Sequence, residues 1–279
     1  MEQEFLYHVP WHSTDSCGGQ HAGTRVGSGI AFHSHTSLLN HPDVRHLDLY
    51  TSLRDPTGQY HVRRFRQASS LNVMVLADLS ASLASFDKYR QLITISRCIA
   101  WSSYRNGDRF AFLAGADELL PDLHTPLTRH FASLQPLWEQ LSRHQPRGQS
   151  IHALLNCAQH LPAQRSLVFL LTDGHMPLDT LKTLLGRLAM HDVVPLLLWH
   201  EKEYENLPNW RFLRLRDPES RQVRSLWMRP RLQQAIRERF AAQRSAIRHC
   251  CLKFGRAPLF INGTFQAEQL TDYFLGGQA

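Results

Sequence analysis

The chain is poor in the features that mark secreted and membrane-spanning proteins. Its five cysteines are odd in number and scattered, so they fit neither a disulfide framework nor a C-x-x-C metal site. No apolar stretch approaches the roughly 20 residues that a membrane-spanning helix needs. The start, from Met1 to Phe5, lacks the basic and apolar regions of a secretory signal. We therefore expect a cytoplasmic protein without a membrane span.

Phosphate-binding glycine motifs are also absent. Neither G-x-x-x-x-G-K nor G-x-G-x-x-G occurs, so the sequence offers no nucleotide cradle. The formal charge of +7 and the pI near 9.4 point weakly to an acidic partner. Arginines collect near the C-terminus on a predicted helix with an apolar stripe of Leu232, Ile236, Phe240 and Ile247. This pattern favours a solvated polar face, and we expect no nucleic-acid partner.

The composition and hydrophobic pattern of the chain change twice, which predicts three segments. Residues 1–70 are rich in His, Gly, Ser and Arg, and we expect extended strands and loops there. Residues 71–200 alternate apolar strand-like runs with amphipathic helical stretches. Residues 201–279 read as an α+β extension. Strands alternating with helices predict an α/β fold, a doubly wound parallel sheet covered on both faces.

The central segment supplies the predicted core. Four buried strands are expected, at Leu71–Ala77, Arg109–Gly115, Ser166–Thr172 and Val193–Trp199. The predicted helices are Lys88–Tyr104, a stretch from about Pro126 to His144 interrupted by Pro136, Ile151–His160 and Pro177–Met190.

The last segment shows its own turn and helix signals. Trp210–Leu215 and Val223–Trp227 predict a hairpin around the Asp-Pro-Glu-Ser turn at residues 217–220. Pro230 stands in the favoured first turn of the basic helix. Pro258–Ile261 predicts a strand and Phe265–Phe274 a final helix. Cys250 and Cys251 are predicted to be buried thiols at a helix end.

Oxygen-bearing side chains follow two of the predicted strands. Asp78, Ser80 and Ser82 form a D-x-S-x-S run after the first strand, and Asp173 opens a Thr-Asp-Gly turn after the third. Ser150 follows a glycine-containing turn. The carboxyl ends of parallel strands meet at one edge of the sheet, where such folds bind ligands. Two carboxylates and three hydroxyls there predict a site for a divalent cation, Mg²⁺ first, with Ca²⁺ or Mn²⁺ also compatible.

The chemistry of this set favours binding over catalysis. With two carboxylates, the ion keeps part of its charge and at least one exchangeable position, which a carboxylate from another molecule can fill. No obvious general base accompanies the set, so we expect a protein that is not an enzyme. The competing structural interpretation is that Asp78 and the serines merely cap the following helix.

These residues resemble a known family. The strand-D-x-S-x-S start, the loop hydroxyl and the T-D-G turn resemble the metal-ion-dependent adhesion site of von Willebrand factor A domains. The N-terminal part is similar to the G-D-D-x-R-x-I-D-W-x-x-x-A-R signature of MoxR-associated von Willebrand A-like proteins, the DUF58 family. The matching positions, over a resemblance that covers roughly residues 20–275, are Gly23, Gly27, Gly29, Phe32, Asp43, Arg45, Leu47, Asp48, Arg54 and His61–Phe65.

Some positions depart from the family pattern. Leu49 replaces the usual aromatic residue, Leu53 the small residue, and His41-Pro42 the Gly-Asp pair. Ser150 stands where a threonine is common, which keeps the hydroxyl. The metal site therefore looks complete, whereas the N-terminal signature has drifted.

The resemblance implies a function. In such sites the serine hydroxyls contact the ion directly and the aspartates often act through water. Relatives act beside a MoxR-type AAA+ ATPase in assembling or activating other proteins, and some are linked to methanol dehydrogenase maturation. The hypothesis is a non-catalytic adaptor that presents its ion to an acidic residue of a client protein.

Three alternatives remain at this stage. The first is a Mg²⁺-dependent phosphotransferase or hydrolase using Asp78, although Ser80 replaces the second acid of a D-x-D motif. The second is a transition-metal site among His33, His35, His41 and His46, against which stands the chance pairing expected from 17 histidines. The third is a metal-independent binding platform that uses the arginine-rich C-terminal helix and Arg45, Arg54, Arg63 and Arg64. The structural explanation for these arginines is that their salt bridges dock the N-terminal segment onto the core.

Overall fold

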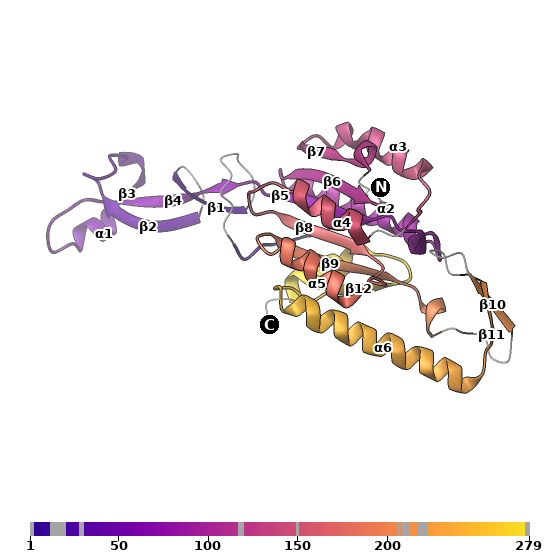
Figure 1. Cartoon of the computed structure of the whole chain (residues 1–279). Helices are drawn as coiled ribbons and strands as arrows, with labels where there is room; N and C mark the ends of the chain where they lie inside the picture. The colour runs from indigo at the N-terminus through magenta and orange to yellow at the C-terminus, as the bar shows by residue number, and fades with distance from the viewer. Residues whose placement is uncertain are drawn as a thin grey trace. The chain divides into compact units, whose positions relative to one another are not determined.

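A computed structural model describes residues 3–11, 21–27, 31–116, 120–148, 151–205, 207, 212–216 and 223–276 (Figure 1). Ser150, Gly29, Cys17 and the predicted turn at residues 217–220 lie outside this part of the chain. The structure separates into two compact units. The larger unit comprises Met1–Tyr7, Asn72–Arg105 and Arg109–Ala279, and the smaller comprises His8–Leu71 and Asn106–Asp108.

A six-stranded sheet forms the centre of the larger unit. The strand order is β12-β9-β8-β5-β6-β7, and every neighbouring pair is parallel except the edge pair β6–β7. The predicted α/β class and doubly wound sheet are thereby confirmed. The bounds are Asn72–Asp78 for β5, Arg109–Gly115 for β6, Thr125–Thr128 for β7, Leu167–Thr172 for β8, Asp192–Trp199 for β9 and Leu259–Asn262 for β12.

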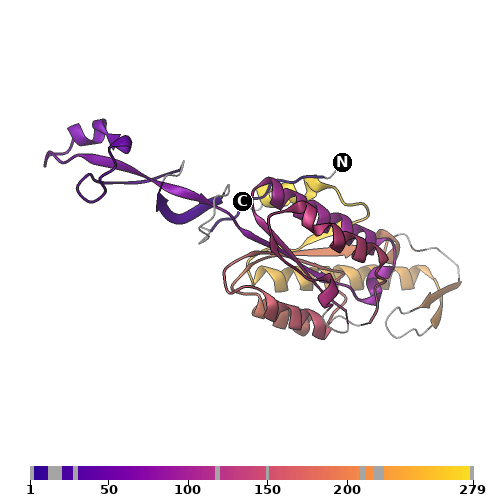
Figure 2. The same ribbon diagram turned by 90° about the horizontal axis from the view of Figure 1, so that it is seen from above.

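Helices cover both faces of this sheet (Figures 1 and 2). Successive strand residues point to opposite faces, so Met74 and Leu76 lie on one side and Val73 and Val75 on the other. The first side joins a core cluster with apolar residues of α4, α5 and α6. On the other side Phe169 packs edge-on against Phe274 of α7, with ring centroids 6.1 Å apart. The bounds are Lys88–Arg105 for α2, Gln135–Arg143 for α3, Ile151–Cys157 for α4, Leu178–Arg187 for α5, Pro230–Leu252 for α6 and Ala267–Gly276 for α7.

The helical interpretation of residues 126–134 is wrong. Pro126 lies in β7, an antiparallel edge strand, and a 3₁₀ turn at Phe131–Leu134 precedes α3. An edge strand tolerates proline because it does not need every backbone N–H for the ladder. Pro136 lies in the first turn of α3, where its missing N–H costs nothing, so it helps to start that helix and does not interrupt one.

The C-terminal predictions hold where the structure describes them. β10 (Phe212–Arg216) and β11 (Val223–Trp227) pair antiparallel as a two-stranded sheet, and α6 begins at Pro230. Cys250 and Cys251 are free and buried near the end of α6. Burial raises the pKa of the Cys251 thiol to about 12, so this pair is poorly suited to redox chemistry. Among the described helices, none has the length and apolar character to span a membrane.

The smaller unit is an antiparallel sheet with one short helix. Its strand order is β1-β4-β2, and β3 also pairs with β4. The strands and loops predicted for this part of the chain are observed. The short helix α1 follows β3 directly. The bounds are His21–Gly27 for β1, Ala31–Ser37 for β2, Leu47–Asp48 for β3, Leu49–Leu53 for α1 and His61–Ser69 for β4.

Asp48, a residue of the N-terminal signature, is the polar centre of this unit. Its Oδ2 accepts hydrogen bonds from Arg63 Nε at 2.6 Å and pairs with His35 Nε2 at 2.9 Å, while Oδ1 accepts from the Thr51 amide. The hydrogen bond from Arg63 holds the pKa of the Asp48 carboxyl well below its usual value. Asp48 and Arg63 therefore have a structural role within the smaller unit, whereas the salt-bridge explanation expected partners on the core.

Candidate metal site

The candidate site is built at the carboxyl edge of the sheet, where β5 and β8 end side by side. These strands pair in parallel with Ala77 opposite Leu171, so Asp78 and Thr172 are the next residues in register. Thr172 Oγ1 donates a hydrogen bond to Asp78 Oδ2 at 2.8 Å. The fold thus joins two strand ends that are 94 residues apart in the chain. Sequence reasoning included Thr172 in the T-D-G turn but missed this contact, which only the strand register reveals.

The D-x-S-x-S run forms a tight loop in which Ser80 makes no side-chain capping bond. Asp78 Oδ1 accepts a hydrogen bond from the Ser80 amide at 2.9 Å, and the Ser80 and Ser82 hydroxyl oxygens lie 3.0 Å apart. The 3₁₀ turn Ala81–Ala84 begins at Ser80, whose side chain makes no capping bond to it. The two hydroxyls therefore face each other, so the capping interpretation is wrong for Ser80.

A second loop is hydrogen-bonded to this run. The Arg147 amide donates to the Leu79 carbonyl at 3.2 Å, and the Ala81 amide donates to the Gly148 carbonyl at 3.1 Å. Ser150 lies outside the described residues, but it follows Gly148 by two positions and directly precedes α4. The described residues before Ser150 are therefore hydrogen-bonded to the loop that carries Ser80 and Ser82.

One carboxylate oxygen of Asp173 is buried without a hydrogen-bond partner. The residue is 2% exposed, and its Oδ1 accepts a hydrogen bond from the His175 amide at 3.1 Å. Its Oδ2 is buried and has no hydrogen-bond partner, although His175 Nε2 lies 4.0 Å away. A buried carboxylate oxygen without a partner is costly, and a bound cation or its water is one way to satisfy it. The donor set of Asp78, Ser80, Ser82 and Asp173 fits a hard divalent ion.

Glycine is required at the turn after Asp173. Gly174 has φ +69°, and its amide donates to Thr172 Oγ1 at 3.1 Å. A Cβ at this position would lie 2.6 Å from Leu197 Cδ1. The Thr-Asp-Gly order is thus a backbone requirement, because a residue with a side chain is strained at this positive φ.

Gly115 holds α4 close to the end of β6. A Cβ on Gly115 would approach Ala153 Cβ to 2.7 Å and the Ala153 carbonyl carbon to 3.0 Å, and backbone cannot yield cheaply. We expect Gly115→Ala to lower the free energy of unfolding by about 1–3 kcal/mol and to shift the helix that follows Ser150. Urea unfolding measures the loss.

The matched control is Gly186→Ala in α5. The nearest atom to a Cβ there is Phe254 Cε1 at 4.0 Å, so this change is expected to stabilise by about 0.5–1 kcal/mol through helix propensity. Equal effects of the two substitutions would contradict the close approach of α4 to β6.

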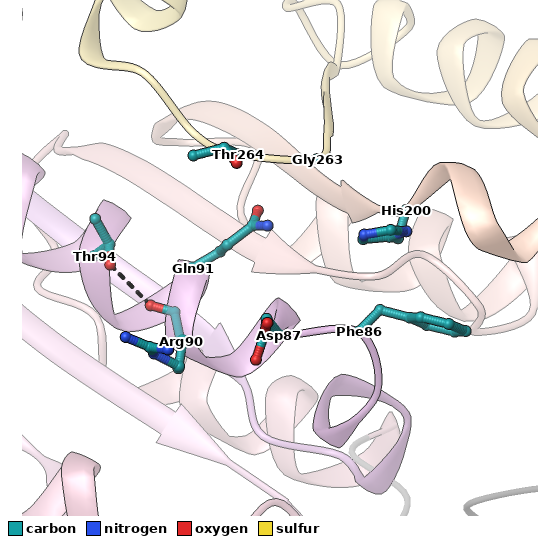
Figure 3. Close-up of a pocket in the computed structure, with 8 residues that line it drawn as sticks. All are labelled: Phe86, Asp87, Arg90, Gln91, Thr94, His200, Gly263 and Thr264. Carbon is teal, nitrogen blue, oxygen red and sulfur yellow. Dashed lines mark hydrogen bonds between the residues drawn. The ribbon is translucent and has the colours of Figure 1, made fainter.

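A pocket of about 280 Å³ lies at the same edge of the sheet (Figure 3). It is bounded by the start of α2, by His200 after β9 and by Gly263 and Thr264 after β12. Phe86 and His200 stack with ring centroids 5.2 Å apart. Phe86 and Asp87 both have positive φ, at 56° and 57°, a conformation that costs each residue about 1–2 kcal/mol.

A buried ion pair stabilises this region. Lys88, the first residue of α2, is 2% exposed and donates from Nζ to Glu203 Oε1 at 2.6 Å. Glu203 Oε2 accepts from the His200 amide at 3.2 Å. This pair, which sequence reasoning did not identify, ties the start of α2 to the loop after β9 and so holds the left-handed Phe86–Asp87 segment in place.

Histidine, cysteine and acidic side chains form no alternative metal centre in the described part of the chain, where no group of three or more gathers. His35, one of the histidines considered for a transition-metal site, is instead hydrogen-bonded to Asp48 within the smaller unit.

Comparison with solved structures found several partial matches. Solved structures with a similar fold include the conserved hypothetical protein BatB from Bacteroides thetaiotaomicron, at 16% identity and a TM-score of 0.44 over 75% of this chain and 98% of that one. The VWA domain of SpRpn10 matches at 14% identity and a TM-score of 0.37 over 75% and 95%. An aerotolerance-related membrane protein from Bacteroides fragilis matches at 13% identity and a TM-score of 0.40 over 74% and 98%.

A search of curated proteins found no relative. The family described as "Protein of unknown function DUF58" matches residues 41–249, three quarters of the chain. The match includes Asp48, Asp78, Ser80, Ser82, Ser150 and Asp173. The chain belongs to the DUF58 family.

Proposed function

We propose that this chain is a non-catalytic, metal-dependent adaptor that binds a partner protein through a divalent ion, Mg²⁺ first. The observation that carries the proposal is Asp173 Oδ2, a buried carboxylate oxygen without a hydrogen-bond partner. It belongs to an oxygen-only set that includes the paired hydroxyls of Ser80 and Ser82. Asp78, Asp173, Ser80, Ser82 and Ser150 would hold the ion, and it would leave a position for a partner's carboxylate.

The proposed partners follow from the family resemblance. A MoxR-type AAA+ ATPase would act with this chain, and an acidic residue of a client protein would complete the coordination of the ion. The role would be the assembly, maturation or activation of that client, for which methanol dehydrogenase is one candidate.

The geometry of Asp78 supports binding over catalysis. Both of its oxygens accept hydrogen bonds, from the Ser80 amide and from the Thr172 hydroxyl. Such bonds stabilise the carboxylate and lower its reactivity as a phosphate acceptor. Position 80, where a D-x-D phosphotransferase carries its second acid, is a serine. We therefore expect no turnover of phosphate esters.

The test is binding of the purified chain to its candidate client, methanol dehydrogenase, measured by calorimetry with Mg²⁺ and with EDTA. We expect EDTA or Asp173→Ala to weaken binding at least tenfold, or about 1.4 kcal/mol. The control is Asp179→Ala, because that carboxylate is 95% exposed in the first turn of α5. Equal binding in EDTA and with Asp173→Ala would contradict the proposal and favour the metal-independent platform.

A further inference from the structure

A second pocket, of about 260 Å³, lies between α6 and the loop after β9. Its inner wall is aromatic, made by Trp199, Tyr204 and Phe240. Its rim is formed by Arg237, Ala241 and Arg244 on α6 and by Glu205 in the loop after β9. The pocket therefore combines an apolar interior with an entrance that carries two arginines and one glutamate, and the arginines are in excess.

Residues of the pocket and of α6 contact the loop that carries Asp173. Trp199 Nε1 donates to the carbonyl of Asp173 at 2.7 Å, and Gln243 Nε2, from α6, donates to the carbonyl of Gly174 at 2.9 Å. The ring of His175 packs edge-on against Phe240 at 6.1 Å. A ligand that reaches the ion is therefore adjacent to a ligand that enters the pocket.

The aromatic wall is rigid. Tyr204 and Phe240 stack at 5.1 Å with an interplanar angle of 21°, and Trp199 meets each of them edge-on, at 6.0 Å and 5.4 Å. Trp199 is buried, whereas Ala241 is exposed. The small alanine leaves the space above the rings open, so a larger side chain at position 241 would fill it.

The charge of α6 specifies the kind of ligand. The helix carries a single acidic residue, Glu238, and five arginines that are all exposed. Arg244 lies with its guanidinium carbon 4.7 Å over the Phe260 ring, and Arg237 donates to the Glu205 carbonyl at 3.2 Å. These contacts orient the two rim arginines while leaving donor N–H groups for an anion. The five arginines are Arg231, Arg237, Arg239, Arg244 and Arg248.

We propose that this pocket binds an aromatic or large apolar side chain from an acidic segment of the partner protein, with neighbouring carboxylates of that segment on Arg237 and Arg244. The inference rests on the proposed function, because another carboxylate of the same segment would reach the metal ion. It adds a basis for partner specificity. The ion would bind the carboxylate of one acidic residue, and the pocket would bind the apolar side chain of a nearby residue. Anchors of this kind, seated in desolvated aromatic pockets, dominate many interfaces.

The test uses two fluorescein-labelled peptides, Glu-Asp-Trp-Asp-Glu and Glu-Asp-Ala-Asp-Glu, with fluorescence polarisation on the full chain in millimolar Mg²⁺. We expect the tryptophan peptide to bind at least tenfold more tightly than the alanine peptide. Ala241→Trp, which fills the pocket, is expected to abolish that difference. Arg244→Glu should weaken the tryptophan peptide about tenfold, and the matched control Arg239→Glu, exposed on α6 outside the pocket, by much less.

The outcomes separate the pocket from the metal site. Discrimination between the peptides that persists in EDTA and in Asp78→Ala, but is lost in Ala241→Trp, would keep the pocket and overturn the metal-dependent function. Mg²⁺-dependent binding that does not discriminate between the two peptides would support the metal-dependent function and overturn the pocket inference. A short oligothymidylate that binds more tightly than either peptide, and that Arg239→Glu and Arg244→Glu weaken alike, would mark α6 as a general polyanion surface and overturn the inference. Circular dichroism confirms that each variant is folded.

Discussion

Millimolar Mg²⁺ is expected to raise the melting temperature of the wild-type chain by about 5–10 °C relative to EDTA. An ion at about 100 times its dissociation constant adds roughly 2.7 kcal/mol to the free energy of unfolding, because it binds the folded state only. For a chain of this size, 1 kcal/mol corresponds to about 2–4 °C. Asp78→Ala is expected to lose this increment. The measurement is a thermal melt of each protein with and without the ion.

The increment, not the absolute melting temperature, is the informative quantity for Asp78→Ala. The substitution also removes the acceptor of the Ser80 amide and of the Thr172 hydroxyl, which lowers stability without any ion. Asp179→Ala, at an exposed position of α5, should keep the full Mg²⁺ increment. Equal increments in the wild type and in Asp78→Ala would place the ion elsewhere and contradict the site.

Glu203→Ala is expected to lower the free energy of unfolding by about 3–5 kcal/mol. The substitution leaves the Lys88 ammonium, 2% exposed, without its carboxylate, and an unpaired buried charge is among the costliest defects a fold can carry. The His200 amide also loses its acceptor. Guanidinium unfolding measures the loss. The start of α2 and the left-handed Phe86–Asp87 segment should be the first parts to gain hydrogen-exchange lability.

Two controls isolate the ion pair. The double variant Lys88→Met/Glu203→Leu removes both charges and should recover most of the loss, because two apolar side chains of similar size carry no unpaired charge. Lys182→Ala breaks a surface ion pair in which the Lys182 side chain is 57% exposed and the Asp179 side chain 95% exposed. This substitution should lower the free energy of unfolding by less than about 1 kcal/mol. If Glu203→Ala lowers the free energy of unfolding as little as Lys182→Ala does, the Lys88 ammonium reaches solvent without its partner, and the prediction is contradicted.

Buried strands and amphipathic helices were predictable because their patterns depend on local sequence. Asn72–Asp78 is buried along its whole length and reads as a continuous apolar run, as expected for the centre of a parallel sheet. Lys88–Arg105 buries Leu92, Ile95, Cys98 and Ile99 at helical spacing. The helix predicted from about Pro126 was wrong at its start because this stretch forms β7, in which Thr125 and Thr128 lie opposite Phe112 and Phe110 of β6. That pairing depends on a strand elsewhere in the chain, which the local sequence does not reveal.

The candidate site was partly predictable for the same reason. Asp78 and Asp173 could be placed at strand ends from sequence alone, because the strands before them are strongly apolar. The hydrogen bond from Thr172, the residue before Asp173, to Asp78 could not be predicted, since it depends on β5 and β8 being neighbours in the sheet. The orphaned Oδ2 of Asp173 and the Lys88–Glu203 pair are properties of packing, and no spacing in the sequence indicates them.

The sequence by itself determined the family, the α/β class and the oxygen-rich residues at the carboxyl ends of two strands, because each depends on short motifs and local periodicity. Only the tertiary structure decided that Thr172 holds Asp78, that Gly148 anchors the loop ahead of Ser150, and that Trp199 joins an aromatic pocket to the Asp173 loop. These contacts join residues from different strands and helices. Strand order and helix packing bring them together, and a linear pattern carries neither.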